Sequence, residues 1–469
     1  PRMLPRDLVD FTGRTAELDR ADALVRAAGP GAAILAVTGM AGVGKTAFAT
    51  RVAHLASAAY PDGQLFVDLH GHSAERGPMP AHEALDLLLR MAGEPCEHPS
   101  GDGTGSGTVL AAARWRATLA RRRMIVVLDN AADAAHIRPL LPGDSASLVV
   151  ITGRGPLAEV DGAHQLPLGV LSTAEAAALF TAITGTAITG TAITGTDAAA
   201  APERRGRAAV EVARLCGNLP LAVRLAAVRL RERPTWPAEE LVGRLRGDHA
   251  LDELRLGSRS VSQAFHASYR ALTDTEQRVF RCLGLLPGPD ADAAAITALT
   301  AAPPARIRPV LESLLDRNLL EQHASNRFRL HPLLRRYALR AAGREDSEPV
   351  RRAAAGRLAE HYLVHARSAL RLLRPPRALL ALDGPDRLFP HARAAAQWLA
   401  VERPNLTAAA YRPATGLPAE RTRALVQLLA RYDELTRSAL RPGRQRELGQ
   451  GRDLGRQRAV ALEGRSGLG

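Results

Sequence analysis

The chain has 469 residues, 46% of them hydrophobic, and a formal net charge of +14 at pH 7. One hydrophobic core cannot organise that length, so we expect two to four domains. No stretch of 18 uncharged apolar residues occurs, and the first residues lack the apolar centre of a signal peptide, so we expect a cytoplasmic protein without membrane contact. The chain begins with proline, which leaves open whether it is a fragment of a longer protein.

Neither the cysteines nor the charge points to a specific ligand. Cys96, Cys216 and Cys282 are widely separated and lack C-x-x-C spacing, which argues against a disulfide framework or a zinc site and for reduced core thiols. The arginines are spread along the whole chain, and aromatic residues make up only 4%. The need for solubility explains such a charge, and a surface that binds nucleic acid would explain it equally well.

The first 171 residues predict a P-loop α/β domain with an open parallel sheet. Short apolar runs, three of them rich in β-branched residues, have the character of buried parallel strands. They lie at residues 33–37, 65–69, 124–128 and 148–151. A helical stretch follows the second run at 81–91, and a Gly/Ser-rich segment at 99–107 is predicted to be a loop.

Strand signals nearly vanish after residue 171, and residues 172–248 predict a helical domain. Ser172 and Glu175 form a capping-box pattern for a helix that runs to residue 180. Thr-Ala-Ile-Thr-Gly then repeats three times over 181–195, which we interpret as a low-complexity loop. Helices are expected again at 203–216 and 219–233.

Residues 249–345 predict a winged-helix domain, and helical character returns after it. Three helical stretches and a small hairpin support the winged helix; they lie at 273–286, 290–299 and 304–317, with extended pieces at 319–321 and 327–330. Residues 346–440 are helical, notably at 358–372 and 391–401, and 441–469 form a low-complexity or disordered tail. The expected fold class is therefore multidomain α/β plus α.

The only lysine of the chain lies in a phosphate-binding motif. Residues 39–46, Gly-Met-Ala-Gly-Val-Gly-Lys-Thr, fit G-x-x-x-x-G-K-[ST]. In such a loop, which contains Gly39, Gly42 and Gly44, backbone N–H groups surround the phosphates and the compact ammonium of Lys45 reaches the β/γ oxygens. Thr46 supplies a hydroxyl to Mg²⁺. A strand enters the loop and a helix leaves it, so we expect ATP or ADP as ligand.

Asp129 ends the third apolar run and suits the acidic residue that holds Mg²⁺ in this class of fold. With Lys45 it is the expected catalytic machinery. The next residue is Asn130, whose amide cannot act as a general base. Unless another carboxylate reaches the site, hydrolysis should be slow, as befits a switch.

Two arginines are candidate nucleotide contacts by position. Arg154 follows the fourth run, at the carboxyl edge where open α/β sheets bind ligands, and is placed to sense the γ-phosphate. Arg14 precedes the sheet and is placed to pack against the base or ribose. For either arginine the alternative interpretation is a solvated surface charge.

The ordered series of motifs resembles the STAND class of signalling NTPases in its NB-ARC arrangement. Residues 11–14 (Phe-Thr-Gly-Arg) resemble the adenine-side hhGR motif, and residues 39–46 and 124–129 are similar to Walker A and Walker B. Residues 152–154 (Thr-Gly-Arg) resemble the sensor strand end, whose arginine contacts the γ-phosphate in that class. Residues 216–222 match the motif whose proline, here Pro220, packs on adenine.

Within that class the chain looks like the ATPase module of actinobacterial SARP-type (AfsR-like) antibiotic-regulatory transcriptional activators. Residues 61–69 and 138–143 carry this resemblance, and residues 398–406 resemble the helix that leads into their tetratricopeptide (TPR) repeats. In those proteins a DNA-binding region and a transcriptional activation domain precede the ATPase. The resemblance therefore implies that DNA is contacted by domains outside this chain.

The chain departs from the family pattern at two positions. His331 stands where the family histidine touches the β-phosphate of ADP, but Pro332 replaces the acid that normally follows it. The alternative interpretation of His331 is a polar residue at a helix start. Gly153 replaces a serine in the sensor motif.

These motifs favour an ADP/ATP-binding switch that regulates transcription of secondary-metabolite genes, with weak ATPase activity and nucleotide-dependent self-association. Arg154 would favour ATP and His331 would favour ADP. One alternative is a DNA-binding protein that uses its own winged helix, whose third helix carries Arg306, Arg308 and Arg317 among leucines at core spacing. Another is a fast ATPase, which Asn130 disfavours.

Overall fold

The computed structural model describes eight stretches of the chain, and contact clustering divides it into two compact units. The described residues are 1–27, 31–72, 77–94, 105–155, 157–185, 201–373, 388–411 and 419–439. Unit 1 comprises Pro1–Gly284 and Pro303–Asp346, and unit 2 comprises Leu285–Ala302 and Ser347–Gly469. Most of the predicted 181–195 loop and the whole 441–469 tail lie outside the described residues.

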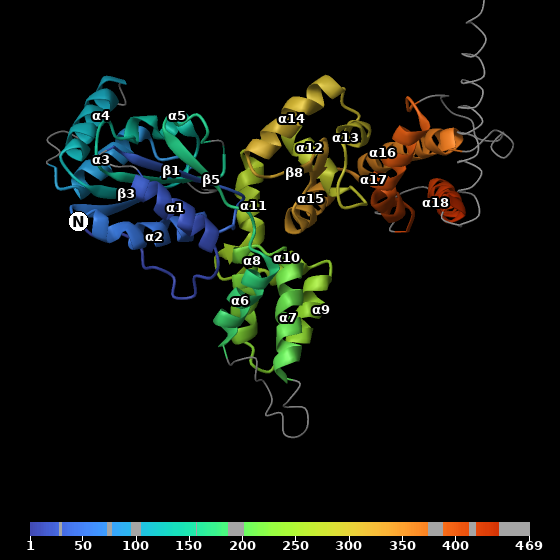
Figure 1. Cartoon of the computed structure of the whole chain (residues 1–469), viewed down its shortest axis with the longest axis horizontal. Coiled ribbons are helices and arrows are strands. Elements are labelled where there is room, and N and C mark those ends of the chain that lie inside the picture. The colour runs from blue at the N-terminus through green and yellow to red at the C-terminus, as the bar shows by residue number, and fades with distance from the viewer. Residues whose placement is uncertain are drawn as a thin grey trace, which may run out of the picture. The chain divides into compact units, whose positions relative to one another are not determined.

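A five-stranded sheet forms the N-terminal part of unit 1, and all its strand pairs are parallel (Figure 1). The strand order is β2-β3-β4-β1-β5. The strands are β1 (Ala33–Thr38), β2 (Gly63–Asp68), β3 (Met124–Ala131), β4 (Leu148–Gly153) and β5 (Ala163–Pro167). The predicted open parallel sheet is confirmed.

Burial explains why four strands were predictable and β5 was not. The apolar residues of β3 and β4 are fully buried, which suits inner strands covered on both faces. Edge strand β5, Ala-His-Gln-Leu-Pro, buries only Leu166 and therefore lacks an apolar run.

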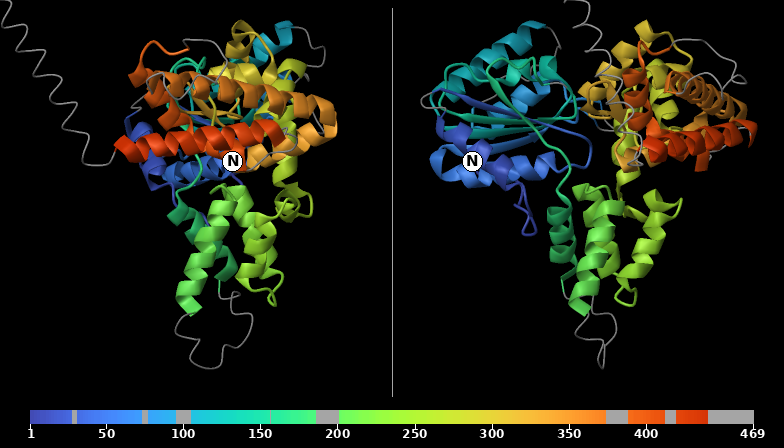
Figure 2. Two further views of the ribbon diagram at one scale, coloured as in Figure 1. Left: turned by 90° about the vertical axis from the view of Figure 1, so that its right-hand side faces the viewer. Right: turned by 45° about the vertical axis from the view of Figure 1, so that its right-hand side comes forward.

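Helices cover both faces of the sheet (Figures 1 and 2). On one face α3 (Ala81–Met91) and α4 (Gly105–Ala120) pack together over the main core cluster, and on the other α1 (Thr15–Ala27) packs against α2 (Lys45–Ala56). Helix α4 begins inside the segment predicted as a loop. Its fully buried Trp115 and Leu119 anchor it against the sheet, and tertiary packing overrides the helix-disfavouring glycines at its start.

A helical segment follows the sheet. Its helices are α6 (Thr173–Thr184), α7 (Ala201–Leu215), α8 (Pro220–Arg231), α9 (Ala238–Arg246) and the short α10 (Ala250–Glu253). The predicted capping box starts α6: Ser172 Oγ accepts a hydrogen bond from Glu175 N, and the Glu175 side chain accepts one from Ser172 N. Helix α6 continues into the first repeat because Ile183 and Thr184 are buried.

The rest of unit 1 carries two of the three helices predicted for the winged helix, together with the hairpin, whereas the predicted helix at 290–299 corresponds to α13 (Ala293–Thr300) and falls in unit 2. This part of unit 1 consists of β6 (Arg255–Leu256), β7 (Arg259–Ser260), α11 (Val261–Arg270), α12 (Asp274–Gly284), α14 (Pro304–Asp316), β8 (Glu321–Ala324), β9 (Arg327–Arg329) and α15 (Pro332–Glu345). Strands β8 and β9 pair antiparallel, and Asn326 turns the hairpin in the left-handed region with a φ of 53°. Helix α11 had no counterpart among the predicted elements.

Unit 2 is helical. It contains α13 (Ala293–Thr300), α16 (Glu348–Leu373), α17 (Ala392–Tyr411) and α18 (Ala419–Ala439). Helix α16 packs against the other three. A buried polar cluster joins them to the chain before α13: Asn405 Nδ2 donates to Glu402 at 2.7 Å and to Asp290 at 3.0 Å.

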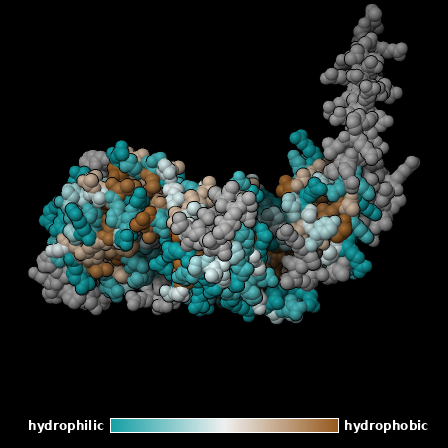
Figure 3. All heavy atoms as spheres, turned by 90° about the horizontal axis from the view of Figure 1, so that it is seen from below, coloured by the Kyte–Doolittle hydropathy of each residue, from teal (hydrophilic) through white to brown (hydrophobic). Residues whose placement is uncertain are grey.

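No helix in the described part of the chain combines the length and apolar character that a bilayer crossing requires. Hydrophobic side chains at the surface form separate patches among hydrophilic ones in the face that Figure 3 shows. Exposed apolar residues include Val109 and Leu110 on α4.

The anchor of α4 gives a stability prediction. Trp115→Phe should lower the free energy of unfolding by about 1–3 kcal/mol, because it leaves a void and removes the 2.9 Å hydrogen bond from the indole N–H to the Leu140 carbonyl. Denaturant unfolding measures the change. Leu110→Ala on the same helix is the control, expected within about 0.5 kcal/mol because Leu110 is 64% exposed. Equal losses in the two variants would contradict this packing.

Candidate functional site

The loop 39–46 connects β1 to α2, and its glycines adopt backbone conformations and close contacts that a side chain would disfavour. Gly44 precedes the first residue of α2 in the left-handed region with a φ of 96°, where side chains are disfavoured. Gly39 has a φ of 151°, and a Cβ there would lie 2.5 Å from the Leu168 carbonyl oxygen. No side chain caps α2, so the N–H groups of its first turn are available to an external anion.

Lys45 lies at the centre of this loop. Its ammonium donates to the carbonyl oxygens of Gly39 at 2.8 Å and Met40 at 3.0 Å. Burial, reinforced by the charge of Arg154, lowers the pKa of Lys45 to about 7. A phosphate at the loop would offset both effects, since it brings negative charge to an ammonium that now has only carbonyl partners.

A buried carboxylate joins three elements beside the loop. Asp129 of β3 accepts from Thr46 Oγ1 of α2, 2.9 Å from each carboxylate oxygen, and from Thr152 Oγ1 of β4 at 2.6 Å. Burial raises the pKa of Asp129, and these hydroxyl groups act against that rise. Carboxylate and hydroxyl oxygens are the ligands that Mg²⁺ prefers, so this pair fits the predicted metal site.

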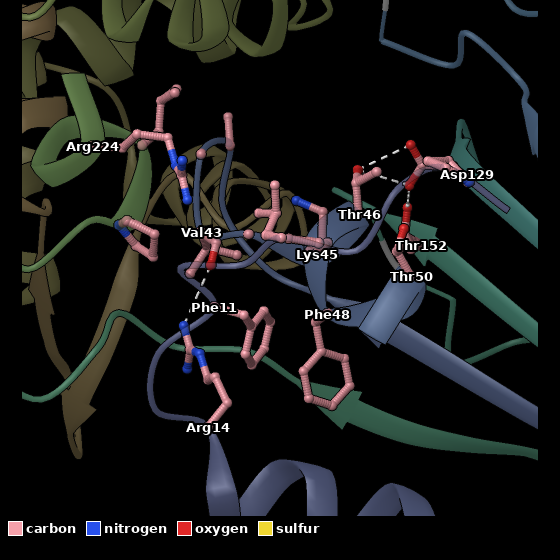
Figure 4. Close-up of a pocket in the computed structure, with 18 of the residues that line it drawn as sticks. Phe11, Arg14, Val43, Lys45, Thr46, Phe48, Thr50, Asp129, Thr152 and Arg224 are labelled. Carbon is pink, nitrogen blue, oxygen red and sulfur yellow. Dashed lines mark hydrogen bonds between the residues drawn. The ribbon is translucent and has the colours of Figure 1, made fainter. Parts of the chain in front are cut away.

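A pocket of about 680 Å³ opens over the loop, a size suited to a small-molecule ligand. Figure 4 shows Asp129, Thr46 and Thr152 on one side of Lys45, and Phe11, Arg14 and Arg224 on the other. The pocket lining includes most of the residues predicted to bind nucleotide: Arg14, Gly42, Gly44, Lys45, Thr46, Asp129, Arg154 and Pro220. Gly39 and His331 are the predicted residues outside it.

Arg14 lines the pocket, but its guanidinium is committed to the protein. It is 6% exposed and donates to the carbonyl oxygens of Val43 and Gly169, while its backbone N–H donates to Glu175 at 2.9 Å. Glu175 is the capping-box residue of α6. The arginine therefore holds the N-terminal segment, the phosphate loop and α6 together at the pocket wall.

The start of α8 brings the helical segment to the loop. Pro220 lines the pocket beside Gly44, and Leu221 N donates to Gly42 O at 3.1 Å. One turn later Arg224 also lines the pocket, paired with Asp10 at 2.6 Å. Sequence reasoning missed Arg224, although its spacing of four residues from Pro220 places both on one helix face.

Arg154 connects the pocket to α11. Its guanidinium donates to Ala264 O at 2.9 Å and to Ser268 Oγ at 2.8 Å. Its backbone carbonyl accepts from Asn318 Nδ2 at 3.1 Å. The predicted sensor side chain thus lines the pocket while it is bonded to the winged-helix segment.

His331 lies away from the pocket lining and joins two segments of unit 1. Its Nδ1 accepts from Leu333 N at 3.2 Å at the start of α15, which leaves a proton on Nε2 to donate to Gly217 O at 2.8 Å. Burial lowers its pKa, consistent with a neutral ring. Both ring nitrogens are therefore engaged by protein groups.

Two further lining residues had no role in the sequence analysis. Thr152, within the motif ending at Arg154, bonds Asp129 and accepts from Asn130 N at 2.9 Å. Asp68, the last residue of β2, lines the same pocket. Its nearest signal in the sequence was its position at the end of an apolar run.

The chain is homologous to two curated regulatory proteins named AfsR. It is 39% identical to the one from Streptomyces griseus over 430 residues, which are 89% of this chain and 42% of that protein. It is 38% identical to the one from Streptomyces coelicolor over 455 residues, 93% of this chain and 43% of that protein. The chain therefore spans less than half the length of these relatives. The resemblance to AfsR-like regulators predicted from the motifs is confirmed.

Other comparisons give weaker similarity. No protein-family model matches the chain. A STAND protein with a tetratricopeptide repeat sensor from Pyrococcus horikoshii aligns with a TM-score of 0.29 and 17% identity over 79% of this chain and 48% of that one. The ORC2 protein of Aeropyrum pernix aligns with a TM-score of 0.39 and 15% identity over 76% and 98%.

The Asp129 cluster gives a second stability prediction. Thr152→Val keeps the shape of the side chain but removes a donor to a buried carboxylate and the acceptor of Asn130 N. It should lower the free energy of unfolding by about 1–3 kcal/mol in denaturant unfolding. Thr181→Val, which removes an exposed hydroxyl bonded to Ala177 O, is the control and should change little. Unchanged stability in Thr152→Val would show that this hydroxyl is dispensable.

Proposed function

We propose, on the premise of homology to AfsR regulatory proteins, that this chain is the cytoplasmic ADP/ATP-binding switch of a regulator of secondary-metabolite genes. One observation carries the proposal. A single pocket is lined by the phosphate loop, by Asp129, by α8 and by an arginine that is bonded to α11. A nucleotide in that pocket would touch the N-terminal segment, the phosphate loop, the strand ends of the sheet and α8, while His331 links α15 to Gly217.

The proposed binding roles follow from the contacts. Lys45 and the N–H groups around Gly42 and Gly44 bind the phosphates, with Gly39 shaping the loop. Pro220 packs against the base, and Arg14 fixes the pocket wall around it. Thr46 and Asp129 would hold Mg²⁺, which neutralises phosphate charge when bound.

Arg154 is the proposed source of switching. A ligand shifts a conformational equilibrium only through contacts that differ between the two states. ADP and ATP share the diphosphate contacts, so a γ-phosphate must supply the difference. Its negative charge would compete with Ala264 O and Ser268 Oγ for the Arg154 guanidinium, because a guanidinium–phosphate pair, in which both groups are charged, is stronger than a guanidinium bond to a neutral acceptor. ATP would thereby release α11.

His331 is proposed to favour the ADP state through a protein contact. Its bond to Gly217 O ties the start of α15 to the turn before Pro220, and a Cβ on Gly217 would lie 2.3 Å from the His331 ring. This close fit depends on Gly217 and would be lost if α15 moved. The residue thus stabilises the closed arrangement without touching the phosphates itself.

The wider partners are proposed from the sequence resemblance to SARP-type regulators. We propose that DNA is contacted by domains outside this chain and that ATP promotes self-association. The winged-helix segment is a weaker candidate for DNA binding. Arg306 and Arg308 on α14 are exposed, but Glu312 and Asp316 on the same helix are exposed as well and offset their charge.

The nucleotide that copurifies with the protein tests the site. Wild-type protein should carry ADP or ATP, identified by chromatography after denaturation, and Lys45→Ala should carry less than about a tenth as much because the charge that binds the phosphates is lost. Arg26→Ala, at an exposed ion pair on α1, is the control and should retain wild-type occupancy. Absence of nucleotide from all three proteins, together with no binding on addition, would refute the proposal.

The Arg154 contact predicts the direction of the switch. Ser268→Ala removes one of two acceptors that hold the guanidinium, so the affinity for a non-hydrolysable ATP analogue relative to ADP should rise about tenfold. Arg154→Ala should abolish the preference for ATP. Ser258→Ala, in an exposed turn, is the control. Calorimetric titration measures both affinities, and an unchanged ratio in Ser268→Ala would exclude the competition mechanism.

A further inference from the structure

A second carboxylate reaches the phosphate end of the pocket. Asp129 is followed by Asn130, so β3 supplies one acid only. The neighbouring strand β2 ends at Asp68, and Asp68 is the register partner of Asp129 in the parallel β2–β3 pair. Paired residues of adjacent strands share a sheet face, and both carboxylates line the pocket with Asn130 and Arg154.

The surroundings of Asp68 orient one of its oxygens. His70 N donates to Oδ1 at 2.8 Å, and Asn130 Nδ2 donates to the same oxygen at 3.5 Å. Within the described part of the chain, all the hydrogen bonds and ion pairs of Asp68 use Oδ1. The other oxygen, Oδ2, is therefore available to a water molecule. The negative charge of Asp68 also contributes to the raised pKa of Asp129, as expected for two acids at one site.

We propose that Asp68 is the carboxylate that orients the attacking water and accepts its proton when ATP is hydrolysed at this site. The proposal rests on the proposed function. The water oxygen forms a bond to the γ-phosphorus while the bond from that phosphorus to the β–γ bridging oxygen breaks. The electron pair of the broken bond leaves with ADP, the phosphoryl group becomes inorganic phosphate, and the water proton passes to the Asp68 carboxylate.

Asn130 has a positioning role in this arrangement. It adopts a φ of 59°, in the left-handed region, which asparagine tolerates better than most residues. Its amide donates to Asp68 Oδ1 at 3.5 Å, which leaves Oδ2 as the oxygen that can accept from a water molecule. The proposed proton acceptor, Asp68, thus lies on β2, and the amide that orients it, Asn130, lies on β3. The Asp68 side chain remains 46% exposed, so bulk water competes with the attacking water for its carboxylate. Hydrolysis would therefore be slow, as a regulatory switch requires.

Single-turnover hydrolysis of bound ATP tests the assignment. Asp68→Asn should slow the hydrolysis of ATP bound to the full chain by at least about 100-fold, because general-base catalysis contributes about 10²–10⁴ in rate. Affinities for ADP and for a non-hydrolysable ATP analogue should stay within about twofold. Asp68→Glu should restore part of the rate, and Asn130→Ala should lose part of it.

The control is Asp62→Asn, just before the opposite end of β2, where the carboxylate accepts from Arg123 N. It should leave the hydrolysis rate unchanged. A wild-type rate in Asp68→Asn would overturn the proposal while leaving nucleotide binding intact. An equal loss of both affinities in Asp68→Asn would also overturn it, since the residue would then be structural. Failure of the proposed function would instead appear as a wild-type chain that binds no nucleotide.

Discussion

The buried carboxylate of Asp129 is the point on which the pocket depends. It lies near the end of the inner strand β3, and its two oxygens accept hydrogen bonds from hydroxyl groups of α2 and β4. An unpartnered carboxylate at 6% exposure would be costly, so the sheet, the helix after the phosphate loop and the sensor strand are fixed relative to one another by the need to satisfy it. Lys45 and Arg154 line the same pocket as Asp129. The phosphate end of the pocket is therefore preorganised within the α/β part of unit 1.

The rest of the pocket is built from segments that follow the sheet in the chain. Pro220 and Leu221 touch the phosphate loop from α8, and Ala264 and Ser268 hold Arg154 from α11. These contacts lie at the pocket, where a ligand can compete with them, whereas the Thr152–Asp129 hydrogen bond is buried. The proposed nucleotide would consequently change the contacts of α8 and α11 without disturbing the sheet. Such a difference in local stability is what a switch requires.

The sequence predicted those parts of the molecule whose signals are local. The phosphate loop, the four apolar strands, the capping box at Ser172 and the hairpin near Asn326 each depend on neighbouring residues, and each is present. Helix α4 was missed because its glycine-rich start disfavours a helix and only the packing of Trp115 decides otherwise. Helix α11 was missed too, and with it the partners of Arg154. Asp68 and Arg224 escaped notice because strand register and helix packing, not sequence proximity, bring them to the pocket.

In the proposed switch, the positions of the two acids would let one site bind nucleotide tightly and hydrolyse it slowly. Asp129 is buried and fully engaged by hydroxyl groups, which suits a metal-holding group but leaves it poorly placed to accept a proton. Asp68 is half-exposed and has one oxygen directed by Asn130, which suits proton acceptance but subjects it to competition from solvent. If the two roles are divided between β3 and β2 as proposed, the hydrolysis rate would vary with the exposure of Asp68, while the affinity would depend on Lys45, Thr46 and Asp129. The lifetime of the proposed ATP state would then be adjustable without loss of the ligand, unlike in an ATPase that carries both acids at one strand end.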